Sequence, residues 1–367
     1  MNLENLGWNK FFENNFEAYK SEGYLAGRVS RENRGNYIVL SNESQMLAEI
    51  SGKFQHNADY RSDYPAVGDW VVFSMREENR ATIHAVLERK SKFTRQAVLS
   101  GGNPDGGGKT DEQVLAANID TIFLVSGLDD DYNPRRIERF VSIAWDSGAV
   151  PVILLNKSDL CDDIESVITE VESVAFGVPT FAISAKDSIG LDNIHQYLIQ
   201  GQTVAFLGSS GVGKSSIINC LFGEERLKTT EVRGDDSKGR HTTTHRELLV
   251  LPEGGIVIDT PGMRVIRAWS NDEGISRTFE DIEKLTGQCR FSDCKHQSEP
   301  GCAIQAGLSD GTISTKRYES YLKLQKEIAH LERRKDVKMN RQQGRDMSKR
   351  IRQHTQAVRD MRKKGLM

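Results

Sequence analysis

Apolar residues follow two different patterns along the 367 residues of the chain, and the pattern changes near Asp111. Before it, short apolar stretches are separated by polar or glycine turns, and they lie at Tyr24–Val29, Asn36–Leu40, Trp70–Phe73 and Thr82–Leu87. Several short strands at this spacing are typical of a small barrel or sandwich. We therefore predict an all-β N-terminal domain, followed by a glycine-rich linker at residues 100–109.

After Asp111, strongly apolar strands alternate with helical segments. The strands are expected at Thr121–Val125, Val150–Leu155, Thr180–Ile183, Thr203–Leu207 and Ile256–Ile258. Pro134 begins a helix whose apolar residues share one face, namely Ile137, Phe140, Val141, Ala144 and Trp145. Apolar strands separated by helices indicate an α/β domain, in which a parallel sheet is covered on both faces.

A phosphate-binding loop is indicated by the sequence G-S-S-G-V-G-K-S, which follows the strand Thr203–Leu207 and precedes a helix at Ser216–Phe222. Backbone amides of such a loop and the N-terminus of its helix surround phosphate oxygens. Lys214 is expected to neutralise the β- and γ-phosphates, and the Ser215 hydroxyl to coordinate Mg²⁺. The expected phosphate contacts are Gly208, Ser209, Ser210, Gly211, Val212, Gly213, Lys214, Ser215 and Ser216. The alternative is a glycine-rich turn without a ligand.

Two further segments indicate that the base is guanine. In the N-K-S-D segment, made of Asn156, Lys157, Ser158 and Asp159, the carboxylate can accept two hydrogen bonds from N1–H and the exocyclic amine of guanine. Adenine offers neither donor in that position, and such a site can reject the wrong base by about four orders of magnitude. After the next strand, Ser184, Ala185 and Lys186 supply a second loop that faces the base. By itself N-K-S-D also fits a helix cap.

The D-T-P-G segment that ends the strand Ile256–Ile258 completes the nucleotide motifs. Asp259 is expected in the Mg²⁺ shell, and the amide of Gly262 at the γ-phosphate. The order of the motifs is unusual, because Asn156 and Ser184 precede Gly208. The same sheet can still form if the chain is circularly permuted.

A metal site is indicated by three cysteines and a histidine within fourteen residues, Cys289, Cys294, His296 and Cys302. Cys₃His is a normal ligand set for structural Zn²⁺, and thiolates favour this metal. Four protein ligands leave no open position for chemistry, so we expect one zinc ion that stabilises the fold. Cys161 and Cys220 lie outside this cluster, and Cys220 is expected in the core.

The net charge of −3 is unevenly distributed. From Leu331 to Met367, thirteen Lys or Arg residues stand against four Asp or Glu residues. A basic segment of this kind indicates nucleic acid as a partner, although a solvated tail is the alternative. The chain shows no secretory signal, no apolar run that could span a bilayer and no cysteine pattern of a disulfide scaffold, so we expect a soluble cytoplasmic protein.

The motif order, the R-H-T-T-T segment at Arg240–Thr244 and the cysteine pattern together closely resemble the RsgA family, bacterial GTPases that depend on the small ribosomal subunit. The resemblance extends over nearly the whole chain. It implies an oligonucleotide-binding (OB) barrel with its extension and linker at residues 1–105 and a circularly permuted P-loop GTPase domain at 106–270. A zinc-binding domain with a helix at 271–335 and a basic tail at 336–367 follow.

The resemblance also implies a function. The expected activity is hydrolysis of GTP to GDP and phosphate with Mg²⁺, stimulated by the small subunit during its late maturation. Contact with ribosomal RNA is implied as well, and the segment Arg89–Arg95, with basic residues around Phe93, is the expected contact in the barrel. We expect a monomer that does not bind membranes.

The residue that activates water does not follow from the D-T-P-G segment. Met263 stands directly after the D-T-P-G glycine, where many GTPases have a glutamine, and its side chain cannot orient water. His241 is the candidate that orients or deprotonates water, and a surface histidine without this role is the alternative. Thr243 is the expected second hydroxyl at Mg²⁺, with Thr242 and Thr244 as immediate rivals.

Two other functions also fit the sequence. The chain could be a GTP-dependent RNA-binding scaffold with negligible hydrolysis, because Met263 replaces the usual glutamine. It could also be a GTPase that acts on another RNA or on protein partners.

Overall fold

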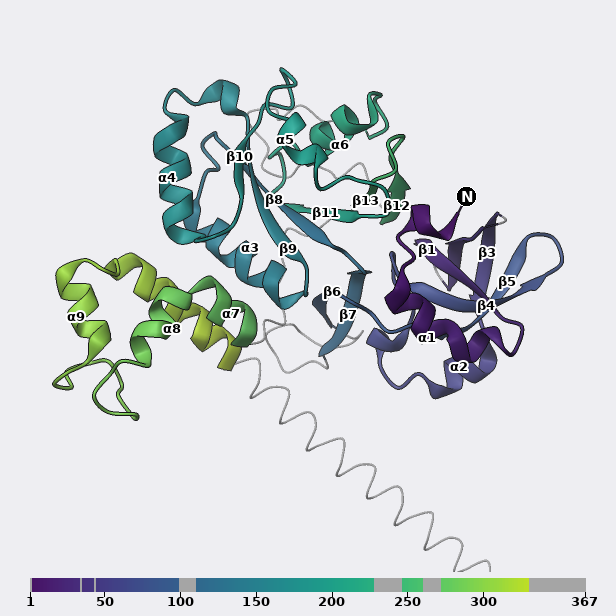
Figure 1. Ribbon diagram of the computed structural model, residues 1–367, viewed down its shortest axis with the longest axis horizontal. Coiled ribbons are helices and arrows are strands. Elements are labelled where there is room, and N and C mark those ends of the chain that lie inside the picture. Colours follow the sequence, from purple (N-terminus) through teal and green to yellow (C-terminus); the bar gives the residue numbers. More distant parts are fainter. Residues whose placement is uncertain are drawn as a thin grey trace, which may run out of the picture. The chain divides into compact units, whose positions relative to one another are not determined.

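The computed structural model describes residues 2–33, 35–42, 44–98, 110–227, 246–259 and 272–329. The chain divides between Gly287 and Gln288 into two compact units (Figure 1). The first unit contains a β-barrel and an α/β sheet, and the second contains the cysteine cluster. The four domain ranges expected from the sequence remain predictions.

The N-terminal barrel closes on itself. Its five strands are β1 (Leu25–Asn33), β2 (Asn36–Leu40), β3 (Gln45–Ile50), β4 (Trp70–Arg76) and β5 (Arg80–Val86). They pair in the order β1-β2-β3-β5-β4, and β4 returns to β1. The barrel of the OB type is therefore confirmed. The strand β3 was not anticipated from the apolar pattern, because only its alternate residues Met46 and Ala48 are buried.

Short helical elements flank the barrel: η1 (Leu3–Leu6), α1 (Lys10–Lys20), α2 (Gly52–Asn57) and η2 (Arg61–Asp63). Asn9 caps α1 by accepting a hydrogen bond from the amide of Phe11. Phe12 and Phe16 of α1 pack against Trp70 and Val72 of β4. The N-terminal extension is thus part of the hydrophobic core of this half of the first unit.

The segment Arg89–Arg95, which was expected to contact RNA in the barrel, lies outside the five barrel strands, and its aromatic ring is buried. Strand β6 (Lys92–Val98) pairs with β7 (Thr110–Ala117) in a separate two-stranded sheet. Phe93 is only 2% exposed and packs in the core of the α/β half, so it cannot stack on a base. Arg89 binds Asp69, which is fully buried, at 2.7 Å. The expectation that Phe93 takes part in an RNA contact was wrong, because its apolar ring is buried in the core.

The α/β sheet has the strand order β10-β9-β8-β11-β13-β12. Its strands are β8 (Thr121–Gly127), β9 (Val150–Asn156), β10 (Thr180–Ala182), β11 (Thr203–Gly208), β12 (Glu247–Val250) and β13 (Ile256–Asp259). The first five strands in this order are parallel, as predicted, and β12 runs antiparallel to β13. Strand β12, which also pairs with β1 of the barrel, was not predicted from the sequence.

Helices cover both faces of this sheet, because alternate strand residues point to opposite sides. On one face lie α3 (Pro134–Asp146) and α4 (Ile164–Val174), which pack on residues such as Ile153 and Leu155. On the other lie α5 (Asp192–His195) and α6 (Lys214–Phe222), which pack on Val152 and Leu154 (Figure 1). A short helix η3 (Ser158–Leu160) follows β9.

The last helices divide between the two units. In the first unit, α7 (Asp272–Thr278) packs on α3, where the Gly274 amide donates to Asp146 Oδ1 at 2.7 Å. The helix α8 (Glu280–Thr286) follows it. The second unit contains α9 (Ala303–Asp310) and a helix over residues 315–329, which agrees with the charged helix expected there. None of the described helices has the length and hydrophobicity needed to span a membrane.

A buried arginine joins the barrel to the α/β sheet. Arg28 of β1 is 1% exposed and donates to the carbonyls of Leu6 (2.5 Å), Gly68 (3.1 Å) and Asn118 (3.0 Å). It also donates to the hydroxyl of Thr203, the first residue of β11, at 2.9 Å. Burial lowers the pKa of Arg28 to about 10, so the guanidinium remains charged at neutral pH. One side chain thus connects four segments that are distant in sequence.

A second connection lies at the sheet edge. Arg31 of β1 stands opposite Glu247 of β12, and their side chains form an ion pair. The neighbouring residues carry the opposite arrangement, with Glu32 on β1 and Arg246 beside β12, at 3.8 Å. These reciprocal charges fix the pairing of the two strands.

We expect Arg28→Met to lower the free energy of unfolding by about 3 kcal/mol, because buried carbonyls lose a charged donor. Urea unfolding followed by tryptophan fluorescence measures this, since Arg28 lies 5.7 Å from the ring of Trp70. As a control, Arg80→Met replaces an exposed arginine of β5 and should change stability by no more than about 0.5 kcal/mol. Equal effects of the two substitutions would contradict a structural role for Arg28.

Candidate nucleotide and metal sites

The G-S-S-G-V-G-K-S loop lies between β11 and α6, as predicted. Gly213 has φ +93°, which favours glycine, and a Cβ there would lie 2.2 Å from Asn156 Nδ2. Lys214 Nζ donates to the carbonyls of Gly208 (2.8 Å) and Ser209 (2.6 Å) across the loop. The loop therefore surrounds the ammonium group of Lys214 at the N-terminus of α6. Helix amides and an ammonium group at one place favour binding of an anion.

Asn156 connects this loop to the two segments expected at the base. Its Nδ2 donates to the carbonyl of Val212 at 2.8 Å, and its Oδ1 accepts from the amide of Ala185 at 3.0 Å. The side chain is 3% exposed. The N-K-S-D, S-A-K and phosphate loops thus meet at one carboxamide, although they are separated by up to 56 residues.

Asp159 is held by the S-A-K loop. The Ser184 hydroxyl donates to Asp159 Oδ1 at 2.7 Å, and Lys186 Nζ lies 3.7 Å from Oδ2. The bond from Ser184 and, to a smaller degree, the charge of Lys186 lower the pKa of Asp159, so the group is a carboxylate at neutral pH. Cys220 of α6 donates to the carbonyl of Ala185 at 3.2 Å, which agrees with its predicted place in the core.

Asp259 ends β13 on the same sheet as the phosphate loop. Its Oδ2 is buried and has no hydrogen-bond partner among the described residues. Burial raises the pKa of Asp259 to about 6, while the charge of Lys214 opposes this shift. An unpartnered, buried carboxylate oxygen fits a hard cation such as Mg²⁺. Three other predicted residues, His241, Thr243 and Gly262, lie outside the part of the chain that the structure describes.

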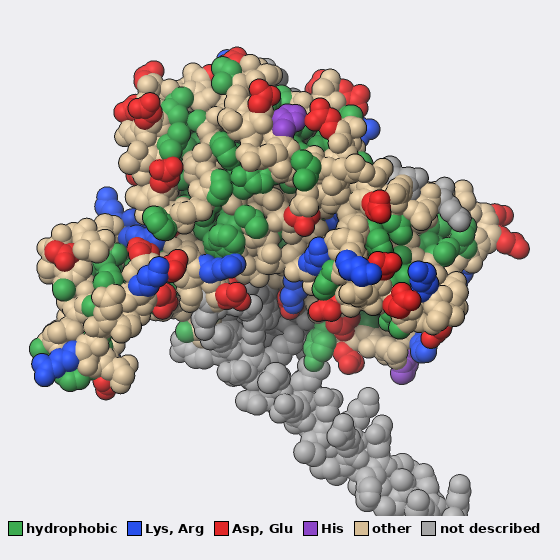
Figure 2. Space-filling view, in the orientation of Figure 1, with side chains coloured by type: hydrophobic (Ala, Val, Ile, Leu, Met, Phe, Trp, Pro, Cys, Tyr) green, Lys and Arg blue, Asp and Glu red, His purple; other side chains and the backbone are tan. Residues whose placement is uncertain are grey.

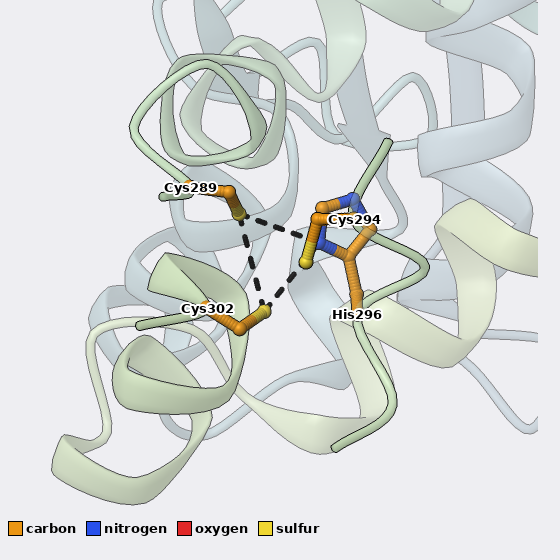
Figure 3. A group of neighbouring side chains, drawn as sticks. All are labelled: Cys289, Cys294, His296 and Cys302. Atoms are coloured by element: carbon orange, nitrogen blue, oxygen red, sulfur yellow. Dashed lines mark hydrogen bonds between the residues drawn. The ribbon is translucent and has the colours of Figure 1, made fainter. Parts of the chain in front are cut away.

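The four predicted metal ligands come together in the second unit (Figure 3). The three sulfur atoms and one imidazole nitrogen all lie within 4.8 Å of one another. His296 presents Nδ1 to this group, at 3.5 Å from the sulfur atoms of Cys289 and Cys302. Burial tends to raise the pKa of Cys289, but the amides of Ala303 and Ile304 at the start of α9 lower it overall. The donor set and its spacing fit one tetrahedral Zn²⁺.

The loop that carries these ligands is held by a residue that the sequence did not single out. The carboxylate of Glu299 accepts bonds from the amides of Lys295 (2.9 Å), Gln297 (2.8 Å) and Ser298 (3.0 Å). Backbone amides, including its own, lower the pKa of Glu299 to about 2. Gln305 of α9 also donates to the carbonyl of His296 at 2.6 Å. The ligand loop is thus fixed by bonds outside the metal shell.

Comparison with known proteins agrees with this geometry. A family model described as RsgA GTPase matches residues 86–269, half of the chain. The chain belongs to the RsgA GTPase family. A second model, described as a 50S ribosome-binding GTPase, matches residues 203–338 of this RsgA chain. The protein is therefore a GTP-hydrolysing enzyme.

Relatives of this RsgA chain match it over most of their length. The small ribosomal subunit biogenesis GTPase RsgA of Opitutus terrae is 45% identical, over 97% of this chain and 98% of that protein. The protein of the same name from Syntrophotalea carbinolica is 44% identical over 90% of each chain.

Solved structures share the fold. The crystal structure of YjeQ from Thermotoga maritima has a TM-score of 0.60 and 28% identity, and the match covers 83% of this chain and 99% of that chain. YloQ, described as a circularly permuted GTPase, has a TM-score of 0.59 and 24% identity, with 84% and 96% covered. The permuted fold predicted for this RsgA chain is thus confirmed.

The raised pKa of Asp259 gives a pH-dependent prediction. Because the folded chain binds this proton more tightly than the unfolded chain, the free energy of unfolding falls as the pH rises from about 4 to about 6. Asp259→Asn removes the buried charge and should stabilise the nucleotide-free protein at pH 8 by up to about 3 kcal/mol.

Urea unfolding at two pH values tests this expectation. The stabilisation by Asp259→Asn should fall to about half at pH 5, because the carboxyl of the folded wild type is then mostly protonated while that of the unfolded chain is still ionised. If Asp259→Asn destabilises the protein equally at both pH values, other groups of the nucleotide-free fold offset the cost of burying the Asp259 charge.

The cysteine cluster predicts one bound zinc ion per chain. Cys302→Ser should abolish it, as measured by metal analysis of protein purified without chelators, because serine is a poor ligand for this metal. Cys161→Ser is the matched control, since Cys161 lies outside the cluster, and it should retain full zinc content. Wild-type protein without zinc, or zinc retained by Cys302→Ser, would refute the assignment.

Proposed function

We propose that the chain hydrolyses GTP while it is bound to the small ribosomal subunit, assists late maturation of that subunit, and is stimulated by it. The relatives are named small ribosomal subunit biogenesis GTPases, which supports this subunit as the partner. The structural observation that carries the proposal is the junction at Asn156, which brings a phosphate loop and two base-facing loops to one point. We further propose that the protein acts as a monomer in the cytoplasm.

The two ends of the nucleotide have different partners in this proposal. The amides from Gly208 to Ser216 and the ammonium of Lys214 hold the phosphates. Asp159 accepts from N1–H and the exocyclic amine of guanine, and Ser184 keeps its carboxylate oriented. The neighbours Lys157, Ser158, Ala185 and Lys186 complete the loops around the base. An adenine nucleotide would leave Asp159 without these donors, which is the basis of selectivity.

The residues around the γ-phosphate complete the proposed site. Ser215, Asp259 and Thr243 hold Mg²⁺, and the buried oxygen of Asp259 supports this for one of the three. When bound, Mg²⁺ neutralises charge on the β- and γ-phosphates. The amide of Gly262 contacts the γ-phosphate, and His241 orients or deprotonates the water. Since Met263 cannot orient water, turnover without the partner is expected to be slow.

Contact with ribosomal RNA is proposed through basic surfaces. In the face drawn in Figure 2, acidic side chains are frequent over α4, α5 and α6, and basic ones, with acidic ones among them, lie lower, between α3 and the barrel. The tail beyond Leu331 carries thirteen Lys or Arg residues. Phosphate contacts of this kind make affinity for the subunit fall steeply with salt.

GTP hydrolysis measured with and without purified small subunits tests the proposal. We expect stimulation of about 100-fold or more by the subunit. His241→Ala should abolish the stimulation while GTP binding persists. The control His195→Ala replaces an exposed histidine beside Glu253 and should be stimulated normally.

The other outcomes have defined meanings. Binding to the subunit without turnover would favour a GTP-dependent scaffold. No interaction with the subunit would indicate another RNA or a protein partner, and normal stimulation of His241→Ala would remove that residue from catalysis.

A further inference from the structure

An ion pair beside the guanine-facing loop is not accounted for by any of the nucleotide motifs. Lys157, the second residue of N-K-S-D, places Nζ 2.5 Å from Asp129 Oδ2. The two side chains are 24% and 29% exposed, so the contact is largely shielded from water. No sequence motif singles out Asp129, which begins a run of three aspartates after β8.

The fold places these two residues together through neighbouring parallel strands. Gly127 of β8 stands opposite Asn156 of β9, and the amide of Leu128 donates to the carbonyl of Asn156 at 2.8 Å. The loops after both strands therefore leave the sheet side by side, at the edge where the phosphate loop also begins. Asp129 belongs to one loop and Lys157 to the other.

The carboxylate of Asp129 is fixed from several directions. Its Oδ1 accepts from the amide of Asp131 at 3.3 Å, and its backbone carbonyl accepts from the amide of Tyr132 at 2.8 Å. A Cβ at position 127 would lie 2.8 Å from Oδ1, so the glycine there leaves room for this side chain. The carboxylate is therefore built into the loop and oriented before any ligand binds.

Lys157 needs such support because of its backbone. Its φ is +66°, a left-handed conformation that is unfavourable for a residue with a Cβ. It stands directly between Asn156, which holds the phosphate loop, and the residues that lead to Asp159. A change in the backbone at Lys157 would therefore move Asn156 and Asp159. The carboxylate of Asp129 holds the ammonium end of the Lys157 side chain and so opposes such a change.

We infer that Asp129 is a positioning residue for guanine nucleotide binding, which acts through Lys157 on the N-K-S-D loop. The inference rests on the proposed function, because it assigns Asp159 to the base. The contact lies at the loop of Asn156 and Asp159, and Asp259 is not one of its partners. Because GTP and GDP share the base and the first two phosphates, we expect it to affect both nucleotides equally and to leave the chemical step unaffected.

Asp129→Asn tests the inference, since it removes the charge and keeps the shape. We expect the Kd of the full-length protein for GDP and for GTP to rise by about tenfold each, the size of one lost charge-assisted hydrogen bond. The change should come mostly from faster dissociation, and KM for GTP should rise without a fall in kcat. The matched control is Asp130→Asn, an exposed neighbour, which should bind as the wild type does.

A double-mutant cycle with Lys157→Gln measures whether Asp129 acts through this lysine. If it does, the double variant is no weaker than Lys157→Gln alone. Additive losses, an unchanged Kd, tighter binding, or a loss confined to GTP would each overturn the inference. Equal thermal unfolding temperatures of the wild type and Asp129→Asn show that a lower affinity does not result from misfolding.

Asp159→Asn separates failure of this inference from failure of the proposed function. Xanthine carries a carbonyl where guanine has its amine, so an asparagine should transfer preference to xanthine nucleotides. If that transfer occurs and Asp129→Asn still binds as the wild type does, only the role of Asp129 is wrong. If Asp159→Asn leaves guanine binding unchanged, the proposed guanine site is itself refuted.

Discussion

The nucleotide-binding half of this protein depends on the buried carboxamide of Asn156. One NH₂ group and one carbonyl oxygen satisfy the backbone of the phosphate loop and of the S-A-K loop at the same time. Because the group is 3% exposed, neither bond is exchanged easily with water. The loops proposed to bind opposite ends of a nucleotide are thereby fixed relative to each other.

The barrel is joined to the GTPase sheet by charge as well as by packing. Arg28 connects the N-terminal extension, the turn at Gly68, Asn118 and the first residue of β11. Strand β11 ends at the G-S-S-G-V-G-K-S loop, so the same strand contacts the barrel at one end and leads into the proposed nucleotide site at the other. The reciprocal ion pairs between β1 and β12 add a second connection. The barrel therefore supports the sheet on which the site is built.

The second unit is organised around a different kind of interaction. Its described part has few buried apolar residues, such as Ile304, Ile313 and Ile328, for its size. Three thiols and an imidazole that converge within 4.8 Å can supply the missing stability when they bind a metal. Glu299 orders the ligand loop through backbone amides and so reduces the entropy lost on metal binding.

The sequence by itself determined the strands with continuous apolar runs, the helix begun by Pro134, the loops that carry nucleotide motifs and the four clustered ligands. These features depend on local pattern and spacing. Tertiary structure decided the rest. It buried Phe93 in the GTPase core, placed β12 between β13 and the barrel strand β1, and paired Asp129 with Lys157. These outcomes depend on contacts between residues far apart in sequence, and a short polar or half-buried segment carries no periodic signal of its partner. Arg28 lies between these two groups. A single arginine within an apolar strand indicates a buried charge, but only the tertiary structure identifies the groups that accept its hydrogen bonds.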